Sequence, residues 1–291
     1  MVIIMLSGGL GNQMFQYALY CRLQELGREV KIDDRRGFID DPNGRVPRLT
    51  QVFGIKYEVA TVREVKDMLD SHRDIISIAR RKLFGRKSRI YREKSGLFDE
   101  AVLTMDNIYL DGYWQSEKYF DSEYVKNRLI NEFAIDKKLV LTDDESRRIL
   151  EQIESEESVS VHVRRGDYLN PGVVENHGGI CTDDYYKRAI EYVLDKKPGA
   201  KLYFFSNDTK WTKEKYGDLG EVVSLEGREE ISDIAELLLM SRCKNHILAN
   251  SSYSWWSAWL NDNSDKLVIV PSKWANLKQM DDIYTDRMIR V

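Results

Sequence analysis

The order of elements at the start of the chain constrains its fold more than any other feature. Residues Val2 to Leu6 form a short apolar run, and a glycine turn follows it. Helical periodicity then runs from Met14 to Leu26, and Val30 and Ile32 resume an extended pattern. A strand, a helix and a second strand in this order form a βαβ unit, which implies a parallel sheet. The N-terminal part is therefore predicted to be an α/β lobe.

A second α/β lobe is predicted in the second half, because 291 residues can bury two cores of moderate size. A predicted helix over 142–155 places the boundary near residue 150. We therefore expect one lobe of residues 1–150 and another of residues 151–291. The second lobe contains apolar strands at 158–163, 202–206, 221–225, 246–249 and 267–270, separated mostly by helical stretches.

Composition limits the classes of partner and compartment. The formal net charge of −4 gives no overall attraction to nucleic acid. The three cysteines form no Cys-x-x-Cys pair, so neither a disulfide framework nor a zinc site is expected. The apolar opening is too short for a signal peptide, and no stretch approaches the ~18–20 apolar residues that span a bilayer. We expect a cytoplasmic protein that is at most peripheral to the inner face of the membrane.

One segment allows such peripheral contact. Residues Arg73 to Lys94 gather many Arg and Lys among Ile, Leu and Phe. Two interpretations stay open, a solvated helix face and a basic face for an acidic membrane or polyanionic partner. The surrounding region, 35–105, is only loosely patterned and gives little information about function.

Polar clusters follow several predicted strands and so mark their carboxyl ends. In open α/β sheets ligands bind at this edge, so clusters from separate parts of the chain can converge on one crevice. The clusters are Ser7 to Asn12, Arg164 to Tyr168, Ser206 to Asp208, Asn250 to Ser254 and Pro271 to Trp274.

The sharpest local signal is the strand that ends in His162-Val163-Arg164-Arg165-Gly166-Asp167. The planar fork of an arginine can give a diphosphate two charge-assisted hydrogen bonds, which strengthen as leaving-group charge develops. The alternative is a structural ion-pair network of Arg164, Arg165 and Asp167. His162 alone has the alternative role of a satisfied core residue.

Two further clusters suit a nucleotide. Asn250, Ser251, Ser252 and Ser254 lie between a predicted strand and a predicted helix, where backbone amides and hydroxyl groups can bind phosphate. Plain N-capping by serine explains them equally well. Asn207 and Asp208 end another strand and have groups suited to a purine edge or a ribose hydroxyl, although turn formation is the alternative.

The turn Ser7 to Gln13 raises a competing hypothesis, a dinucleotide-dependent oxidoreductase with Asp33 or Asp34 on the ribose. Its spacing fails because Met14 stands where the third glycine or alanine should pack. A non-catalytic glycan- or nucleotide-binding module stays possible. The sequence has no Asp-x-Asp pair, no metal-ligand spacing, no P-loop and no Gly-x-Ser-x-Gly elbow.

The same motifs together resemble glycosyltransferase family 11, the α-1,2-fucosyltransferases. The resemblance also includes Gly112-Tyr113-Trp114-Gln115-Ser116-Glu117-Lys118-Tyr119-Phe120, so it extends from the first strand into the last lobe. It implies a GT-B-like pair of facing Rossmann-type lobes with the active site in the cleft between them. It also implies inverting, metal-independent transfer of fucose from GDP-β-L-fucose to the 2-hydroxyl of a β-galactoside, with no cofactor.

The resemblance assigns roles to single residues. The C-terminal lobe would bind GDP-fucose, with Arg164 on the β-phosphate and Arg165 supporting the loop or the donor. Asp208 and Ser252 match positions that contact the nucleotide, and His162 would lie beside it. The acceptor would bind the N-terminal lobe near Gly9 to Gln13, which includes Asn12.

The proton acceptor stays open. Asp167 is the carboxylate within the motif, and it serves either as a base or as a scaffold for the arginines. Proton loss to the departing phosphate would need no carboxylate. The acceptor glycan also stays open, with lactose, a type-1 or type-2 glycan and a lipid-linked O-antigen repeat as candidates.

Overall fold

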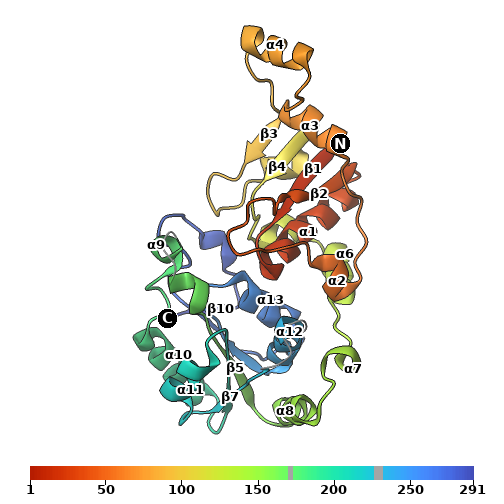
Figure 1. Cartoon of the computed structure of the whole chain (residues 1–291). Helices are drawn as coiled ribbons and strands as arrows, with labels where there is room; N and C mark the ends of the chain where they lie inside the picture. The colour runs from red at the N-terminus through yellow and green to blue at the C-terminus, as the bar shows by residue number, and fades with distance from the viewer. Residues whose placement is uncertain (170–172, 226–231) are drawn as a thin grey trace. The chain divides into compact units, whose positions relative to one another are not determined.

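The computed structural model describes residues 1–169, 173–225 and 232–291 and divides the chain into two compact units, Met1–Phe133 and Ala134–Val291. Each unit contains a parallel sheet with helices beside it (Figure 1). The division lies earlier than the predicted boundary near residue 150. The reason is that α7 (Lys137–Val140) and α8 (Asp144–Ser155) both pack against α12 (Ser232–Arg242) of the second unit.

The first unit has a four-stranded sheet in the order β2-β1-β4-β3, and all three pairings are parallel. The βαβ start predicted from the sequence is therefore confirmed. The elements are β1 (Val2–Ser7), α1 (Leu10–Glu25), β2 (Val30–Gly37), α2 (Leu49–Phe53), α3 (Val62–Leu69), α4 (Ile75–Phe84), β3 (Ile90–Arg92), α5 (Ala101–Thr104), β4 (Ile108–Asp111), the 3-10 turn η1 (Glu117–Phe120) and α6 (Glu123–Glu132).

The second unit has a six-stranded sheet in the order β10-β9-β8-β5-β6-β7, again with parallel pairings throughout. Besides α7, α8 and α12, its elements are β5 (Ser158–Val163), η2 (Gly166–Leu169), α9 (Val174–His177), α10 (Asp183–Lys196), β6 (Lys201–Ser206), α11 (Thr209–Tyr216), β7 (Glu221–Val222), β8 (Asn245–Ile247), α13 (Ser252–Leu260), β9 (Val268–Val270), η3 (Asp281–Ile283) and β10 (Met288–Arg290).

Strand β5 is the central element of the second unit. All six of its residues are buried, and it pairs with β6 on one side and β8 on the other. Helix α13 adds Trp255 and Trp256, both fully buried, and the indole of Trp255 donates to the carbonyl of Ile283 at 2.8 Å. These indoles pack the helix into the unit. The predicted strands 158–163, 202–206 and 267–270 agree closely with β5, β6 and β9, whereas β7 ends at Val222.

The strand order reverses once in each sheet. From β5 the chain proceeds outward to β6 and β7, then returns to the other side of β5 with β8, β9 and β10. In the first unit the corresponding reversal lies between β1 and β4. At such a switch point the two flanking loops leave the sheet in opposite directions, and a crevice opens at the carboxyl ends of the strands. The loops after β5 and β8, and those after β1 and β4, are therefore the places to look for sites.

Candidate functional site

The loops at the switch point of the second unit contain most of the predicted site residues. Arg164 and Arg165 directly follow β5, and Asn250 to Ser254 follow β8 at the start of α13. Asn207 and Asp208 come after β6, the other neighbour of β5. The parallel sheet thus brings these side chains to one edge, as the sequence predicts.

Arg165 is held by the segment that follows β6. Its backbone N–H donates to Oδ1 of Asn207 at 3.0 Å, and its Nε lies 3.5 Å from Oδ2 of Asp208. The guanidinium carbon lies 3.7 Å from the centroid of the Trp211 ring, which is a cation–π contact. Asp208 also caps α11 by accepting from the backbone N–H of Trp211 at 3.2 Å. This half of the arginine pair therefore belongs to a structural network, and nucleotide contacts of Asn207 and Asp208 stay predictions.

The turn after Arg165 requires a glycine. Gly166 has a φ of +34°, and a Cβ atom there would lie 2.2 Å from Nδ2 of Asn207. A side chain at Gly166 would therefore displace the amide that binds the backbone of Arg165.

His162 is buried within the sheet beneath the two arginines. Its side chain is only 3% exposed, and its ring centroid lies 6.1 Å from that of Tyr253. Burial, together with the positive charge of Arg164, lowers the pKa of His162 to about 3. The imidazole is therefore neutral at physiological pH. Its Nδ1 is buried without a hydrogen bond to the described part of the chain, so the expectation of a fully satisfied core histidine is not met.

Glu236 of α12 is a site residue that the sequence did not reveal. Burial and, to a lesser extent, the charge of nearby Asp233 raise the pKa of its carboxyl group to about 7, although Arg164 opposes the rise. Tyr253, whose hydroxyl donates to the backbone carbonyl of Asp233, also senses the charge of Glu236. In the sequence Glu236 stands in a mostly apolar helix among many other glutamates. Only its tertiary neighbours distinguish it.

Arg164 consequently has surroundings different from those of Arg165. Its guanidinium carbon lies 5.5 Å from the centroid of the Tyr168 ring. It interacts electrostatically with the neutral imidazole of His162 and with Glu236, a carboxyl group that titrates near neutral pH. Because Glu236 can be uncharged at pH 7, its attraction for Arg164 depends on pH.

Asn250 ties several loops of this edge together. Its Nδ2 donates to the carbonyl of His177 at 3.2 Å and to that of Trp274 at 3.1 Å. Its Oδ1 accepts from the thiol of Cys181 at 3.4 Å, and its backbone carbonyl accepts from the hydroxyl of Tyr168 at 2.9 Å. The side chain is 2% exposed. These bonds give Asn250 a positioning role, so the predicted nucleotide contact would have to use its backbone.

The start of α13 offers backbone amides more than hydroxyl groups. Ser251 is the N-cap, but its side chain makes no capping hydrogen bond, so the expectation of plain serine capping is not met. The hydroxyl of Ser254 is buried and lies within hydrogen-bonding distance of the carbonyls of Ala249 and Ser251, at 3.3 and 3.2 Å. Ser252 is half-buried in the first turn. The helix end suits an anion through its N–H groups and its dipole.

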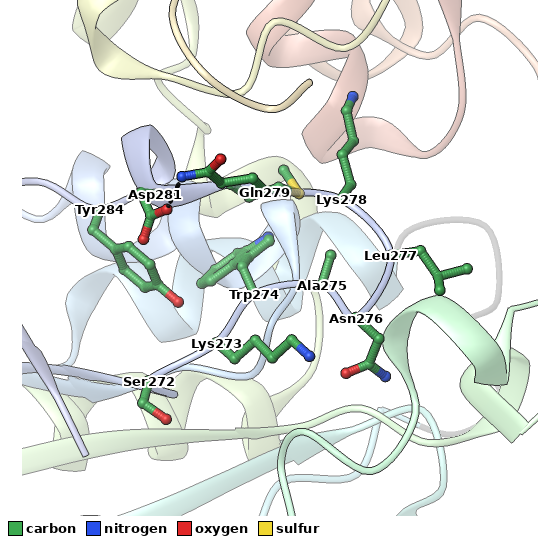
Figure 2. A pocket seen from close by; sticks show the side chains of 11 residues that line it. Ser272, Lys273, Trp274, Ala275, Asn276, Leu277, Lys278, Gln279, Asp281 and Tyr284 are labelled. Atoms are coloured by element: carbon green, nitrogen blue, oxygen red, sulfur yellow. Dashed lines mark hydrogen bonds between the residues drawn. The ribbon is translucent and has the colours of Figure 1, made fainter. Parts of the chain in front are cut away.

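A cavity of about 290 Å³ lies in the loop after β9 (Figure 2). Its volume is at the lower limit of the ~300–1,000 Å³ typical of small-ligand sites. Figure 2 shows Trp274 beside Tyr284, and Gln279 bonded to Asp281 at 2.9 Å. Since Asn250 binds the carbonyl of Trp274, this cavity adjoins the loops that follow β8.

The first unit places Gly9 and Asn12 at its own switch point. Gly9 is the N-cap of α1, and Oδ1 of Asn12 accepts from Nε2 of Gln115 in the loop after β4 at 2.7 Å. The buried Gln16 donates to the carbonyl of Gly112 in that same loop at 2.9 Å. Gly9 and Asn12 thus belong to the first unit, whereas the other predicted site residues belong to the second.

The structure opposes the dinucleotide hypothesis for that turn. Asp33, the expected ribose ligand, is 1% exposed and accepts from the hydroxyl of Tyr109 at 2.9 Å and from the backbone of Arg35 at 3.3 Å. Asp34 accepts from the hydroxyl of Tyr57 at 3.3 Å. Both carboxylates are engaged by the chain itself.

Two predictions about the site stay untested. The side chain of Asp167 lies outside what the structure describes, so its role as base or scaffold stays a prediction. The second is that transfer needs no metal ion. Within residues 1–169, 173–225 and 232–291 no group of three or more His, Cys, Asp or Glu side chains could hold a metal ion, but whether the reaction needs one stays a prediction.

Known proteins resemble the chain over most of its length. The model of the family "Glycosyl transferase family 11" matches residues 56–289. The O-antigen biosynthesis glycosyltransferase WbnK of Escherichia coli is 32% identical over 288 residues, 92% of this chain and 93% of that protein. An α-1,2-colitosyltransferase of Escherichia coli is 29% identical over 299 residues, 100% of this chain and 98% of that protein. The galactoside α-(1,2)-fucosyltransferase 1 of Ateles belzebuth is 26% identical over 262 residues, 87% of this chain and 63% of that protein.

Solved fucosyltransferase structures align with lower similarity. The α-1,6-fucosyltransferase NodZ soaked with GDP-fucose is 14% identical with a TM-score of 0.46, covering 89% of this chain and 92% of that one. The apo form of POFUT1 is 10% identical with a TM-score of 0.44, covering 91% of this chain and 96% of that one.

The role of Asn250 predicts a loss of stability on truncation. Asn250→Ala removes three side-chain hydrogen bonds and leaves the carbonyls of His177 and Trp274 without this donor, so we expect the free energy of unfolding to fall by about 2–4 kcal/mol. Asn276→Ala is the matched control, because its exposed amide donates one hydrogen bond to the described residues, to the carbonyl of Gly178. This variant should lose ~1 kcal/mol or less. Urea denaturation measures both. Equal losses would contradict the positioning role.

Proposed function

Because the chain belongs to glycosyl transferase family 11, we propose that it transfers L-fucose from GDP-β-L-fucose to the 2-hydroxyl of a terminal β-galactoside. Membership makes it a glycosyltransferase. The proposal concerns the finer points, which are the donor, the acceptor, inversion without a metal ion and the residues that take part.

The observation that carries the proposal is the position of Arg164. It follows the central strand β5 directly at the switch point, and the start of α13 follows β8 on the other side. A guanidinium fork and a helix N-terminus at one edge are the groups that a diphosphate requires. We assign the diphosphate of the donor to Arg164 and the first turn of α13. Arg165 supports the loop.

Transfer with inversion breaks one bond and forms another at the anomeric carbon of fucose. The bond from that carbon to the β-phosphate oxygen breaks, and its electron pair leaves with GDP. The acceptor oxygen forms the new bond from the opposite face, and its proton must leave. Arg164 stabilises the charge that develops on the departing phosphate. GDP, the fucosylated acceptor and one proton account for all atoms.

Glu236 responds to the donor rather than serving as the base. Its pKa is about 7 in the free protein, near the charge of Arg164. A bound diphosphate adds negative charge beside it and raises that pKa further, because like charges disfavour the ionised form. Glu236 is then protonated in the donor complex. The acceptor proton goes to Asp167 or to the departing phosphate.

We assign the acceptor to the switch point of the first unit. The loops after β1 and β4 meet there through Asn12 and Gln115, and both loops lie in segments that resemble the family. Gly8, with a φ of +74°, keeps this turn tight, since a Cβ there would lie 2.6 Å from Nδ2 of Asn12.

The donor sugar has a second candidate. One relative whose match covers the whole chain is named an α-1,2-colitosyltransferase. Colitose is L-fucose without its 3-hydroxyl group. Both sugars would be carried by the same nucleotide and attached through the same linkage. A site that hydrogen-bonds the 3-hydroxyl would reject colitose strongly, whereas an apolar site would not.

Arg164→Lys tests the clamp. A point charge replaces a bidentate fork, so we expect turnover to fall by about 10²–10³ while the fold is kept. Arg165→Lys is the matched control, because the contacts of Arg165 with Trp211 and Asp208 are structural. It should lower the melting temperature more than Arg164→Lys does and turnover less. The reverse pattern in steady-state kinetics and thermal unfolding would exchange the two roles.

Glu236→Gln tests the coupling of donor binding to protonation. Wild-type affinity for GDP-fucose should be highest below pH 7 and weaken as pH rises through about 7 and Glu236 ionises. The glutamine variant, always neutral, should bind tightly without this dependence and keep near wild-type turnover. Calorimetry from pH 6 to 9 measures the affinities. An unchanged pH dependence, or turnover lowered more than about 10²-fold, would refute this role and favour a catalytic base.

The function as a whole is tested with GDP-fucose and β-galactoside acceptors in the presence of EDTA. We expect a new α-1,2 linkage, identified by NMR, at a rate unchanged by the chelator. A parallel reaction with GDP-colitose decides between the two donors by their kcat/KM ratio. Binding of NAD without a response to guanine nucleotides would refute the proposal.

A further inference from the structure

Helix α4 of the first unit exposes the side chains that a helix normally buries. No residue of α4 is buried, and Figure 1 shows it standing away from the sheet of its unit. Ile75 is 85% exposed, Ile76 81%, Leu83 76% and Phe84 71%. Ile75, Ala79 and Leu83 follow one another at intervals of four and therefore share one face. We call Ile75, Ile76, Ala79, Leu83 and Phe84 the apolar face of α4.

The helix is fixed in this orientation by its polar residues. Asp70 binds the guanidinium of Arg80 and lies 3.6 Å from that of Arg81. Its second carboxylate oxygen accepts from the backbone of Lys87 at 2.8 Å, beyond the end of the helix. Arg86 donates to the carbonyl of Leu69 at 3.2 Å. The buried carboxylate of Asp70 thus joins α4 to the segment that follows it. Arginines rather than apolar side chains attach α4 to its unit.

The segment is also strongly basic. Residues 71–89 contain seven Arg or Lys and a single acidic residue, Asp74, in a chain whose net charge is −4. Arg73 and Lys82 are exposed beside the apolar face. An anchored helix with an outward apolar face and a basic surround matches helices that lie in the interface of an anionic bilayer.

We propose that α4 docks on an anionic lipid bilayer, with its apolar face in the headgroup boundary and Arg73 and Lys82 on the phosphates. The positive charge favours this partner over a second copy, because two copies would bring like charges together. The contact is peripheral, since no described helix is long and apolar enough to cross a membrane. The inference does not depend on the donor or acceptor proposed above.

Vesicle sedimentation with the full chain tests the proposal. Wild type should bind vesicles of phosphatidylcholine with phosphatidylglycerol and should not bind phosphatidylcholine alone. Ile76→Ser with Leu83→Ser removes the apolar contact and should abolish binding. Arg73→Ser with Lys82→Ser should weaken binding to the anionic vesicles by on the order of tenfold. Because none of these side chains is buried, melting temperatures should be unchanged.

Leu139→Ser is the matched control, because Leu139 is 72% exposed in α7 and far along the sequence from the basic segment. It should leave vesicle binding unchanged. Three results would overturn the proposal: no binding of wild type to anionic vesicles at low salt, equal loss in the control, or binding unaffected by the serine pair. A fourth result would also overturn it. Sedimentation velocity would show a dimer that the double variant Ile76→Ser with Leu83→Ser dissociates, and the wild type would not bind vesicles.

Discussion

The structure depends on the constraint that parallel strands all end at the same edge of a sheet. In both units the strand order reverses once, and most of the predicted site residues lie in the loops beside the reversal. In the second unit these loops hold Arg164 and the start of α13, and in the first they hold Asn12 and Gln115. Residues far apart in the sequence become neighbours because the carboxyl ends of parallel strands lie at one edge of the sheet.

A buried amide stabilises each of these edges. Gln16 accepts from the backbone of Ser7 at 3.0 Å and donates to the carbonyl of Gly112, thereby joining the loops after β1 and β4. Asn250 does the same for the loops around β8 and β9. An amide suits this task because it donates and accepts without a charge, so burying it costs little once both ends are bonded. The loops diverge where the strand order reverses. There the hydrogen bonds of a side chain take the place of the backbone hydrogen bonds that join paired strands.

The sequence predicted what depends on local pattern and missed what depends on tertiary neighbours. Strands β5, β6 and β9 followed from apolar runs. The different environments of Arg164 and Arg165 could not be predicted, because Trp211 and Asp208, on a different segment, determine which arginine is held. Glu236 was missed for the same reason, since burial rather than sequence context raises its pKa.

The electrostatics of the second unit also bear on where the acceptor proton goes under the proposed function. His162 is neutral because its pKa is about 3, so it cannot take up a proton at physiological pH. Burial holds the pKa of Tyr253 well above its usual range, so this phenol does not supply a base either. GDP carries more negative charge than GDP-fucose once the sugar has left. Under the proposed function the proton on Glu236 is held through transfer and released with GDP, and the departing phosphate and Asp167 stay the two candidates for taking the proton of the acceptor hydroxyl.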